Sequence, residues 1–352
     1  MNSTAEMVSN NNFFETINTL LSENKTFFCS RLPNSKRLTL SSGNTKKIPR
    51  SKIKGNGIFI MPFNEKNLGY KINPSFVYET KIEHKLNSNK NSLISLKEFT
   101  KNEDKESYKL SIEKLIEEIR LGKLSKIVFS KKITLDYSDS NQITIFKNIL
   151  DLYSEAFCYL FYTPNEGFWM GASPELLFKT EEDSISTMAL AGTKFNINSD
   201  WGDKEYSEQQ IVQDEILESL KPLCSSVAIG KTQTISAGKI QHLKTDFKGT
   251  TRASTIRLVN ALFPTSAVAG YPRKAALKML SKHEEHERSL YSGFLGTCKD
   301  DDSSLFVNLR CINIKNDKIS FYVGSGITKD SVPDNEWNEI LKKSETMLSA
   351  IF

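Results

Sequence analysis

The pattern of apolar and polar positions predicts both helices and strands along this chain of 352 residues. Where apolar residues recur every three to four positions, the pattern predicts helices at 13–21, 112–119, 203–221 and 255–262. Short runs rich in β-branched and aromatic residues predict strands at 57–61, 126–135, 157–161, 167–170, 176–179, 184–190, 232–244, 305–314 and 318–323.

The order of these elements predicts an α+β fold. Clusters of strands with hairpin-like connections are separated by long helices, which favours antiparallel sheets over alternating βαβ units. We interpret residues 1–352 as a single domain, with a less distinctive N-terminal part (1–105) and a catalytic core (106–352). The basic segment 34–56 is predicted to be a solvated loop and the polar segment 84–106 an exposed connection.

Composition limits the classes of function. The net charge of +5 is small for this length, and the basic segment has no interleaved aromatics, so no nucleic-acid partner is expected. The chain lacks an apolar run of about 18 residues and a signal-like N-terminus, which argues against a membrane span and secretion. Five scattered cysteines without a CxxC pair indicate reduced thiols, and we expect a cytoplasmic protein.

The C-terminal segment carries the strongest chemical pattern. A β-rich run ends in Gly324-Ser-Gly326, which we interpret as a turn with backbone N–H groups available for an anion. In the helix that follows, Glu336, Glu339 and Lys343 share one face because they lie three and four residues apart. Such an arrangement suits a small carboxylated substrate held together with a divalent cation.

Three further residues have a structural and a chemical interpretation. Glu208 on the 203–221 helix is an ordinary surface glutamate unless it converges with Glu336 or Glu339, in which case oxygen-only ligation favours Mg²⁺. Lys126, at a strand start, is either a surface lysine or a base with a lowered pKa. Glu175, before an apolar run, is either a turn residue or a partly desolvated general acid with a raised pKa.

Histidine patterns are less informative. His242 lies in a strand, where a single histidine is more often structural than catalytic. The segment His283-Glu-Glu-His286 has its histidines three residues apart, whereas a zinc-protease helix needs four. We therefore interpret that segment as exposed and charged.

Taken together, the ordered motifs resemble the chorismate-utilising enzymes, the family of isochorismate, anthranilate, salicylate and aminodeoxychorismate synthases. The resemblance runs from about residue 110 to the C-terminus. It rests on the motifs KIVFSKK, GASPELLF, ALAGTK, EQQIVQD, IQHLKT, LFPTSAVAGYPR, ERSLYSGFLG, VNLRC and YVGSGI with the downstream EW, E and K. The family's fold is α+β, a core of two large antiparallel sheets flanked by helices.

The resemblance also implies roles for individual residues. It implies Mg²⁺ as cofactor and chorismate as substrate, with the metal on Glu208 and Glu339 and with Glu336 close by. The implied substrate-binding residues are Thr193, His242, Tyr291, Arg310, Gly324, Gly326 and Lys343. One departure is Gln209, where related isochorismate synthases often have histidine; we interpret it as a change beside the site.

Two positions point to a subfamily. Ala191 stands where aminodeoxychorismate synthases carry a lysine nucleophile, and Lys126 stands where anthranilate synthases have glutamine. The implied enzyme is an isomerase, an isochorismate synthase of menaquinone or siderophore synthesis, in which Lys126 activates water and Glu175 protonates the leaving hydroxyl. A salicylate synthase remains the alternative, and an anthranilate synthase component is disfavoured. We expect a monomer without an amidotransferase subunit.

Overall fold

The computed structural model describes residues 4–82, 100–138, 141–195, 198–237, 240–299 and 302–351. Seven α-helices lie in these ranges: α1 Asn10–Ser22, α2 Asn102–Arg120, α3 Gln142–Leu152, α4 Asp203–Leu220, α5 Thr255–Leu262, α6 Arg273–His283 and α7 Pro333–Ile351. A short 3-10 helix spans Arg50–Lys52.

The strands of the described ranges number eighteen. The first nine are β1 Glu6–Met7, β2 Phe27–Arg31, β3 Arg37–Ile48, β4 Gly57–Met61, β5 Gly69–Lys81, β6 Lys126–Asp136, β7 Phe157–Thr163, β8 Gly167–Ser173 and β9 Leu176–Glu181. The other nine are β10 Ser184–Lys194, β11 Ser226–Ile229, β12 Gln233–Ala237, β13 Ile240–Thr250, β14 Gly270–Tyr271, β15 Phe294–Lys299, β16 Asp302–Val307, β17 Cys311–Lys315 and β18 Lys318–Ile327.

Hydrogen bonds join these strands into one continuous sheet. Its neighbours follow the order β13-β10-β9-β16-β15-β4-β5-β3-β2-β7-β8-β17-β18-β6-β14, with β11 and β12 beside β13. Every pairing in this path is antiparallel, and β1 adds a parallel pairing with β5. The predicted α+β class with antiparallel sheets is confirmed.

The sheet folds back on itself to make the expected two layers. In β7, Cys158 and Leu160 face one apolar core, whereas Phe157, Tyr159 and Phe161 face another. This alternation is what a strand buried on both faces produces. The second core also receives residues of β4 and β15 from the other layer, so it is the interior of the sandwich.

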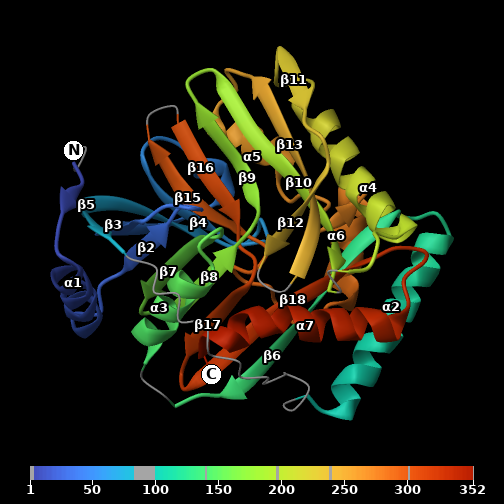
Figure 1. The fold of residues 1–352 in the computed structure, drawn as a ribbon, viewed down its shortest axis with the longest axis horizontal. Coiled ribbons are helices and arrows are strands. Elements are labelled where there is room, and N and C mark those ends of the chain that lie inside the picture. The colour runs from blue at the N-terminus through green and yellow to red at the C-terminus, as the bar shows by residue number, and fades with distance from the viewer. Residues whose placement is uncertain are drawn as a thin grey trace.

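Helices cover the outer faces of both layers (Figure 1). The helices α1, α2, α3, α6 and α7 pack on the layer that contains β6 and β18, while α4 and α5 pack on the layer that contains β10 and β13. Figure 1 shows α7 running across β18 and β6, and α4 alongside β10, β12 and β13. The N-terminal ends of α4 and α7 thus come to the region where the two layers meet.

Several predicted elements differ from the structure. Residues 34–56 are not a loop, because β3 pairs with β5 along its whole length and buries Leu38 and Leu40. The run 305–314 is two strands, β16 and β17, separated by residues 308–310, of which Arg310 has a φ of 47°. The expected strand 232–244 is likewise divided between β12 and β13. Of the predicted connection 84–106, residues 84–99 lie outside the described ranges, and α2 begins at Asn102.

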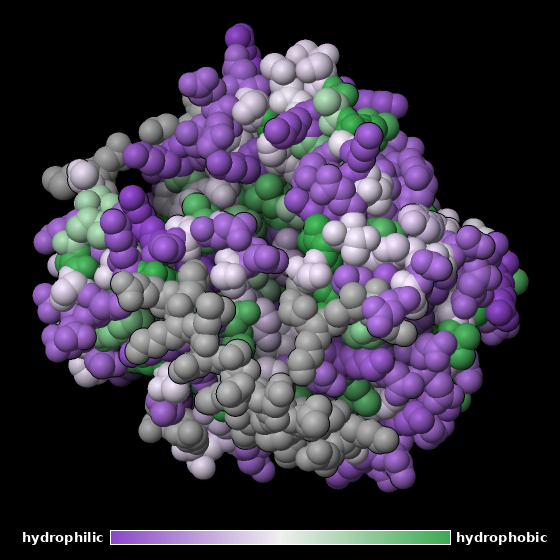
Figure 2. All heavy atoms as spheres, in the orientation of Figure 1, coloured by the Kyte–Doolittle hydropathy of each residue, from purple (hydrophilic) through white to green (hydrophobic). Residues whose placement is uncertain are grey.

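The hydrophilic surface and the free cysteines of the structure agree with what the composition predicted. On the face shown in Figure 2, hydrophilic residues predominate and apolar residues lie in small separate groups. No helix in the described ranges is long and apolar enough to cross a membrane. All five cysteines are free, and four of them are buried.

Candidate active site

A pocket lies where β10 and β13 meet β6 and β18, and it encloses about 770 Å³ including its open mouth. It brings together residues that are far apart in the sequence. Nine of the twelve residues predicted for the site line it: Glu175, Thr193, Glu208, His242, Tyr291, Arg310, Gly324, Gly326 and Lys343. Of the other three, Lys126 and Glu339 pair with the lining residues Glu208 and Lys343, and Glu336 lies one helical turn before Glu339.

Glu175 is a buried acid in the pocket lining. It is 2% exposed, and its Oε1 accepts a hydrogen bond of 3.4 Å from the Thr265 hydroxyl. Burial raises its pKa to about 8, although the nearby Lys126 charge opposes the shift. At neutral pH the group is therefore largely protonated and able to donate a proton, which agrees with the raised pKa expected from the sequence.

Lys126 is fully buried at the start of β6, with its Nζ 3.0 Å from Oε1 of Glu208. Burial alone would raise the pKa of Glu208, but Lys126 and Lys204 outweigh it and hold that pKa below its ordinary value. The contact is an ion pair without a well-aligned hydrogen bond. Lys126 is therefore not the surface lysine that the sequence left open, because its side chain is fully buried and paired with Glu208 of α4.

Two more lysine–glutamate pairs lie beside this one. Nζ of Lys204 is 2.7 Å from Oε1 of the fully buried Glu336, and Nζ of Lys343 is 2.7 Å from Oε1 of Glu339. Burial and the charge of Glu339 raise the pKa of Glu336 despite Lys204. Lys204 lies one turn before Glu208 on α4, so three glutamates and three lysines gather between α4, α7 and β6.

The donor chemistry of these glutamates fits a hard divalent cation. All ligand atoms would be carboxylate oxygens, and Oε2 of Glu336 is buried without a well-formed hydrogen bond, near the Ser331 hydroxyl. Within the described ranges, however, no three acidic, histidine or cysteine side chains converge as a metal-binding group. Each carboxylate is instead held by a lysine, so a cation would have to draw them together.

His242 and Arg310 lie side by side in the wall of the pocket, a neutral ring next to a cation. His242 Nδ1 lies 2.9 Å from the Gly192 carbonyl, and Nη2 of Arg310 lies 2.7 Å from His242 Nε2. Burial and the charges of Arg310 and Lys343 lower the pKa of His242 to about 3, so the ring is neutral. Burial also lowers the pKa of Arg310 to about 10, which leaves it cationic at neutral pH.

The Gly324-Ser-Gly326 segment is not the predicted turn. Both glycines lie in β18, opposite Ser130 and Val128 of β6. Their role is close approach: a Cβ on Gly326 would lie 2.3 Å from Oε1 of Glu208, and one on Gly324 would lie 3.1 Å from the Tyr291 hydroxyl. The missing side chains therefore make room for the pocket's functional groups.

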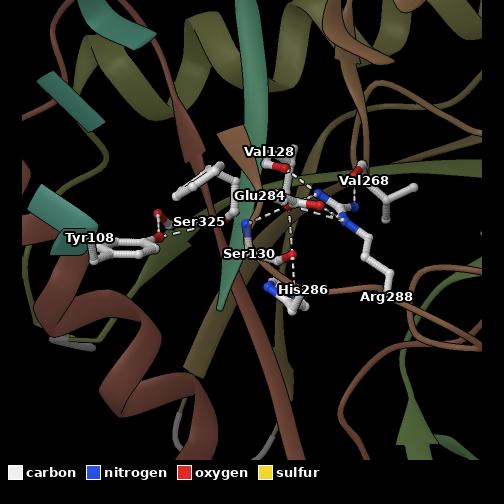
Figure 3. Close-up of polar contacts among 9 residues, drawn as sticks. Tyr108, Val128, Ser130, Val268, Glu284, His286, Arg288 and Ser325 are labelled. Atoms are coloured by element: carbon white, nitrogen blue, oxygen red, sulfur yellow. Dashed lines mark hydrogen bonds and ion pairs between the residues drawn. The ribbon is translucent and has the colours of Figure 1, made fainter. Parts of the chain in front are cut away.

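The segment 283–286, expected to be exposed and charged, is exposed only in part: Glu285 is exposed, whereas the side chain of Glu284 is 7% exposed and contacts β6. Figure 3 shows the Glu284 carboxylate between Arg288 and Ser130. It accepts hydrogen bonds from the Ser130 N–H at 2.9 Å and hydroxyl at 2.6 Å, and pairs with Nη2 of Arg288 at 2.6 Å. Arg288 also donates to the carbonyls of Val128 and Val268, two residues of the pocket wall. This buried pair fixes the loop that presents Tyr291.

Sequence reasoning missed three contributors to the site. Two of them, Thr265 and Arg288, were quoted only as parts of longer motifs and were given no role. Thr265 contacts Glu175. Lys204 was not singled out, although its position four residues before Glu208 places both on one face of α4. Gln209, considered a change beside the site, is 1% exposed and hydrogen-bonded at both ends of its amide.

The amino-acid sequence is similar to those of curated proteins named isochorismate synthase. Isochorismate synthase MenF of Escherichia coli is 30% identical over 256 residues, which is 68% of this chain and 59% of that protein. Isochorismate synthase DhbC of Bacillus subtilis is 27% identical, over 70% of this chain and 68% of that protein. The chain spans 57–60% of the length of the first three relatives, all named MenF.

A solved structure shows the same fold. The menaquinone-specific isochorismate synthase MenF of Escherichia coli superposes with a TM-score of 0.77 at 21% identity, covering 93% of this chain and 89% of that one. The family model described as chorismate binding enzyme matches residues 70–352, four fifths of the sequence. The chain belongs to the chorismate binding enzyme family.

Proposed function

We propose that this protein is an isochorismate synthase, which interconverts chorismate and isochorismate for menaquinone or siderophore synthesis. The observation that carries the proposal is that a buried lysine, Lys126, and a buried, largely protonated glutamate, Glu175, lie at one pocket. The names of the relatives MenF and DhbC support it. The free cysteines support a reducing, cytoplasmic setting.

The proposed reaction is an allylic displacement that takes up one water and releases another. Lys126, as the neutral amine, accepts a proton from water while the water oxygen bonds to C2 of chorismate. Glu175 gives its proton to the C4 hydroxyl as that C–O bond breaks, and the double bonds of the ring shift. The two residues exchange roles in reverse. Lys126 must release Glu208 when the site is loaded, so that its amine is free to accept the proton from water.

The substrate's carboxylates find matching groups in the pocket. Arg310 offers a planar guanidinium whose orientation is held by His242, and Lys343 adds a second cation that also donates to the Gly324 carbonyl at 3.0 Å. Tyr291 is stacked on Tyr322, with ring centroids 5.5 Å apart, and presents its hydroxyl toward Gly324.

We propose Mg²⁺ as the cofactor, held by Glu208 and Glu339 with Glu336 near the metal. When bound, the ion supplies positive charge that fixes the ring carboxylate and offsets its charge. The protein's own contribution is to gather the three carboxylates between α4, α7 and β6, each paired with a lysine.

Product analysis tests this function. Purified protein is incubated with chorismate and Mg²⁺, without and with ammonium, and the products are separated by chromatography. The proposal predicts isochorismate at a reversible plateau in both cases. Salicylate with stoichiometric pyruvate would assign the protein to the salicylate synthases instead, and anthranilate only with ammonium, or unchanged chorismate, would contradict the proposal.

The Lys126→Met variant should lose conversion by at least about 10²-fold, because a positioned base typically contributes 10²–10⁴-fold. Methionine fills the buried space that alanine would leave empty. Initial rates of isochorismate formation, with circular dichroism as a check on folding, give the answer. Lys132→Met, an exposed position on the same strand, should stay active; a fully active Lys126→Met would remove Lys126 as the base.

Glu175 should titrate near pH 8 in the folded protein, against an ordinary value of 4.5. Since the folded state binds this proton more tightly, the native protein loses stability relative to Glu175→Gln as pH rises from about 4.5 to 8. Urea unfolding of both proteins across this range measures the difference. The exposed Glu155→Gln should show no such trend, and a parallel pH dependence for wild type and Glu175→Gln would contradict the buried neutral acid.

Glu339→Gln should raise the Mg²⁺ concentration needed for half-maximal conversion by about tenfold or more, because a charged ligand becomes neutral. Metal titrations of initial rates measure this shift. Glu345→Gln on the same helix, outside the pocket lining, serves as the control. An unchanged titration for Glu339→Gln would place the metal elsewhere.

A further inference from the structure

The side chain of Gln209 connects α4 to the strand that borders the pocket. Its Oε1 accepts the backbone N–H of Ala191 at 2.8 Å, and its Nε2 donates to the Ala189 carbonyl at 3.2 Å. The same Nε2 lies 3.1 Å from the Thr245 hydroxyl of β13. Every polar atom of this buried amide therefore contacts β10 or β13.

The segment that Gln209 holds is a β-bulge. Ala191 pairs with Leu243 and Thr193 pairs with His242, so Gly192 is the extra residue between them. Gly192 has a φ of 70°, in the left-handed region that favours glycine. A bulge breaks the regular ladder and needs another partner for the backbone groups that it displaces; the Gln209 amide supplies one at Ala191.

The bulge in turn sets the orientation of His242. The Gly192 carbonyl can only accept, so His242 Nδ1 carries the proton and donates to it across 2.9 Å. Arginine can only donate, so the unprotonated Nε2 accepts from Arg310 across 2.7 Å. One carbonyl of the bulge thus selects the histidine tautomer that can hold the Arg310 guanidinium at the pocket wall.

We propose that Gln209 is a positioning residue, which fixes the β10 bulge and thereby keeps His242 in the Nδ1–H form that aims Arg310 at a substrate carboxylate. Gln209 touches no substrate; it acts through the bulge. The inference rests on the proposed function for its kinetic consequence, but its structural step concerns only Gln209, Gly192 and His242.

The test compares Gln209→Met, which keeps the length of the side chain and removes its hydrogen bonds, with Gln210→Met. Gln210 is the matched control because it is exposed and bonds only within α4, to Asp214 at 2.8 Å. In protein labelled with ¹⁵N-histidine, the ring nitrogens of His242 should report the Nδ1–H tautomer in wild type and Gln210→Met. In Gln209→Met the ring should become a tautomer mixture.

The kinetic test measures KM for chorismate and kcat separately and compares how much each one changes. Loss of Arg310 alignment weakens binding of a carboxylate that is present throughout the reaction, so KM should rise about tenfold while kcat changes less than about threefold. Gln210→Met should match wild type. A purely structural amide would instead lower stability and leave the tautomer and KM unchanged, and that result would overturn the proposal.

Two arrangements keep the test decisive. If Gln209→Met does not fold, Gln209→Asn keeps a polar amide that is too short to reach both Ala189 and Ala191, and the same tautomer change and a smaller rise in KM are expected. An unaltered His242 and KM in Gln209→Asn would then contradict the inference. If wild type converts no chorismate, the proposed function fails, while the histidine spectra still decide whether Gln209 sets the tautomer.

Discussion

The burial of Lys126 is the constraint on which the rest of the site depends. A fully buried ammonium needs a counter-charge, and Glu208 supplies it at 3.0 Å. That contact is possible only because Gly326 has no side chain where Glu208 lies. The sheet, helix α4 and a glycine of β18 are thereby linked through one ion pair. Replacing any of the three residues changes the environment of the other two.

Charge pairing extends this principle across the site. The paired lysines and glutamates make a cluster without large net charge, which lets acidic groups stay buried between α4 and α7. Glu175, by contrast, has a hydroxyl partner and a more distant lysine, so its burial is offset by protonation. Pairing with Lys126 and Lys204 holds the pKa of Glu208 below its ordinary value, whereas burial with little pairing raises the pKa of Glu175; the two directions suit metal binding and proton donation respectively.

The sequence was sufficient for the fold class, and nine of the twelve residues that it singled out line one pocket. The alternation of residues and the turn residues predicted the hairpins β7–β8 and β9–β10. The motifs are far apart in the sequence, and the fold brings their residues together at the pocket. Long-range pairing was not predictable: β3 carries basic exposed residues, and its pairing with β2 and β5 makes it a strand. The burial of Glu284 and Arg288 likewise depends on contacts with β6 that no local pattern encodes. The roles of the site residues and the metal stay predictions.

Isotope labelling tests the central claim, that a water activated beside Lys126 becomes the new hydroxyl. Chorismate is incubated with the protein and Mg²⁺ in H₂¹⁸O, and both products of the equilibrium are analysed by mass spectrometry. The account predicts one ¹⁸O in isochorismate at C2 and, on approach to equilibrium, ¹⁸O in the C4 hydroxyl of recovered chorismate. Isochorismate formed without ¹⁸O would show that the hydroxyl migrates within the substrate and would contradict the account.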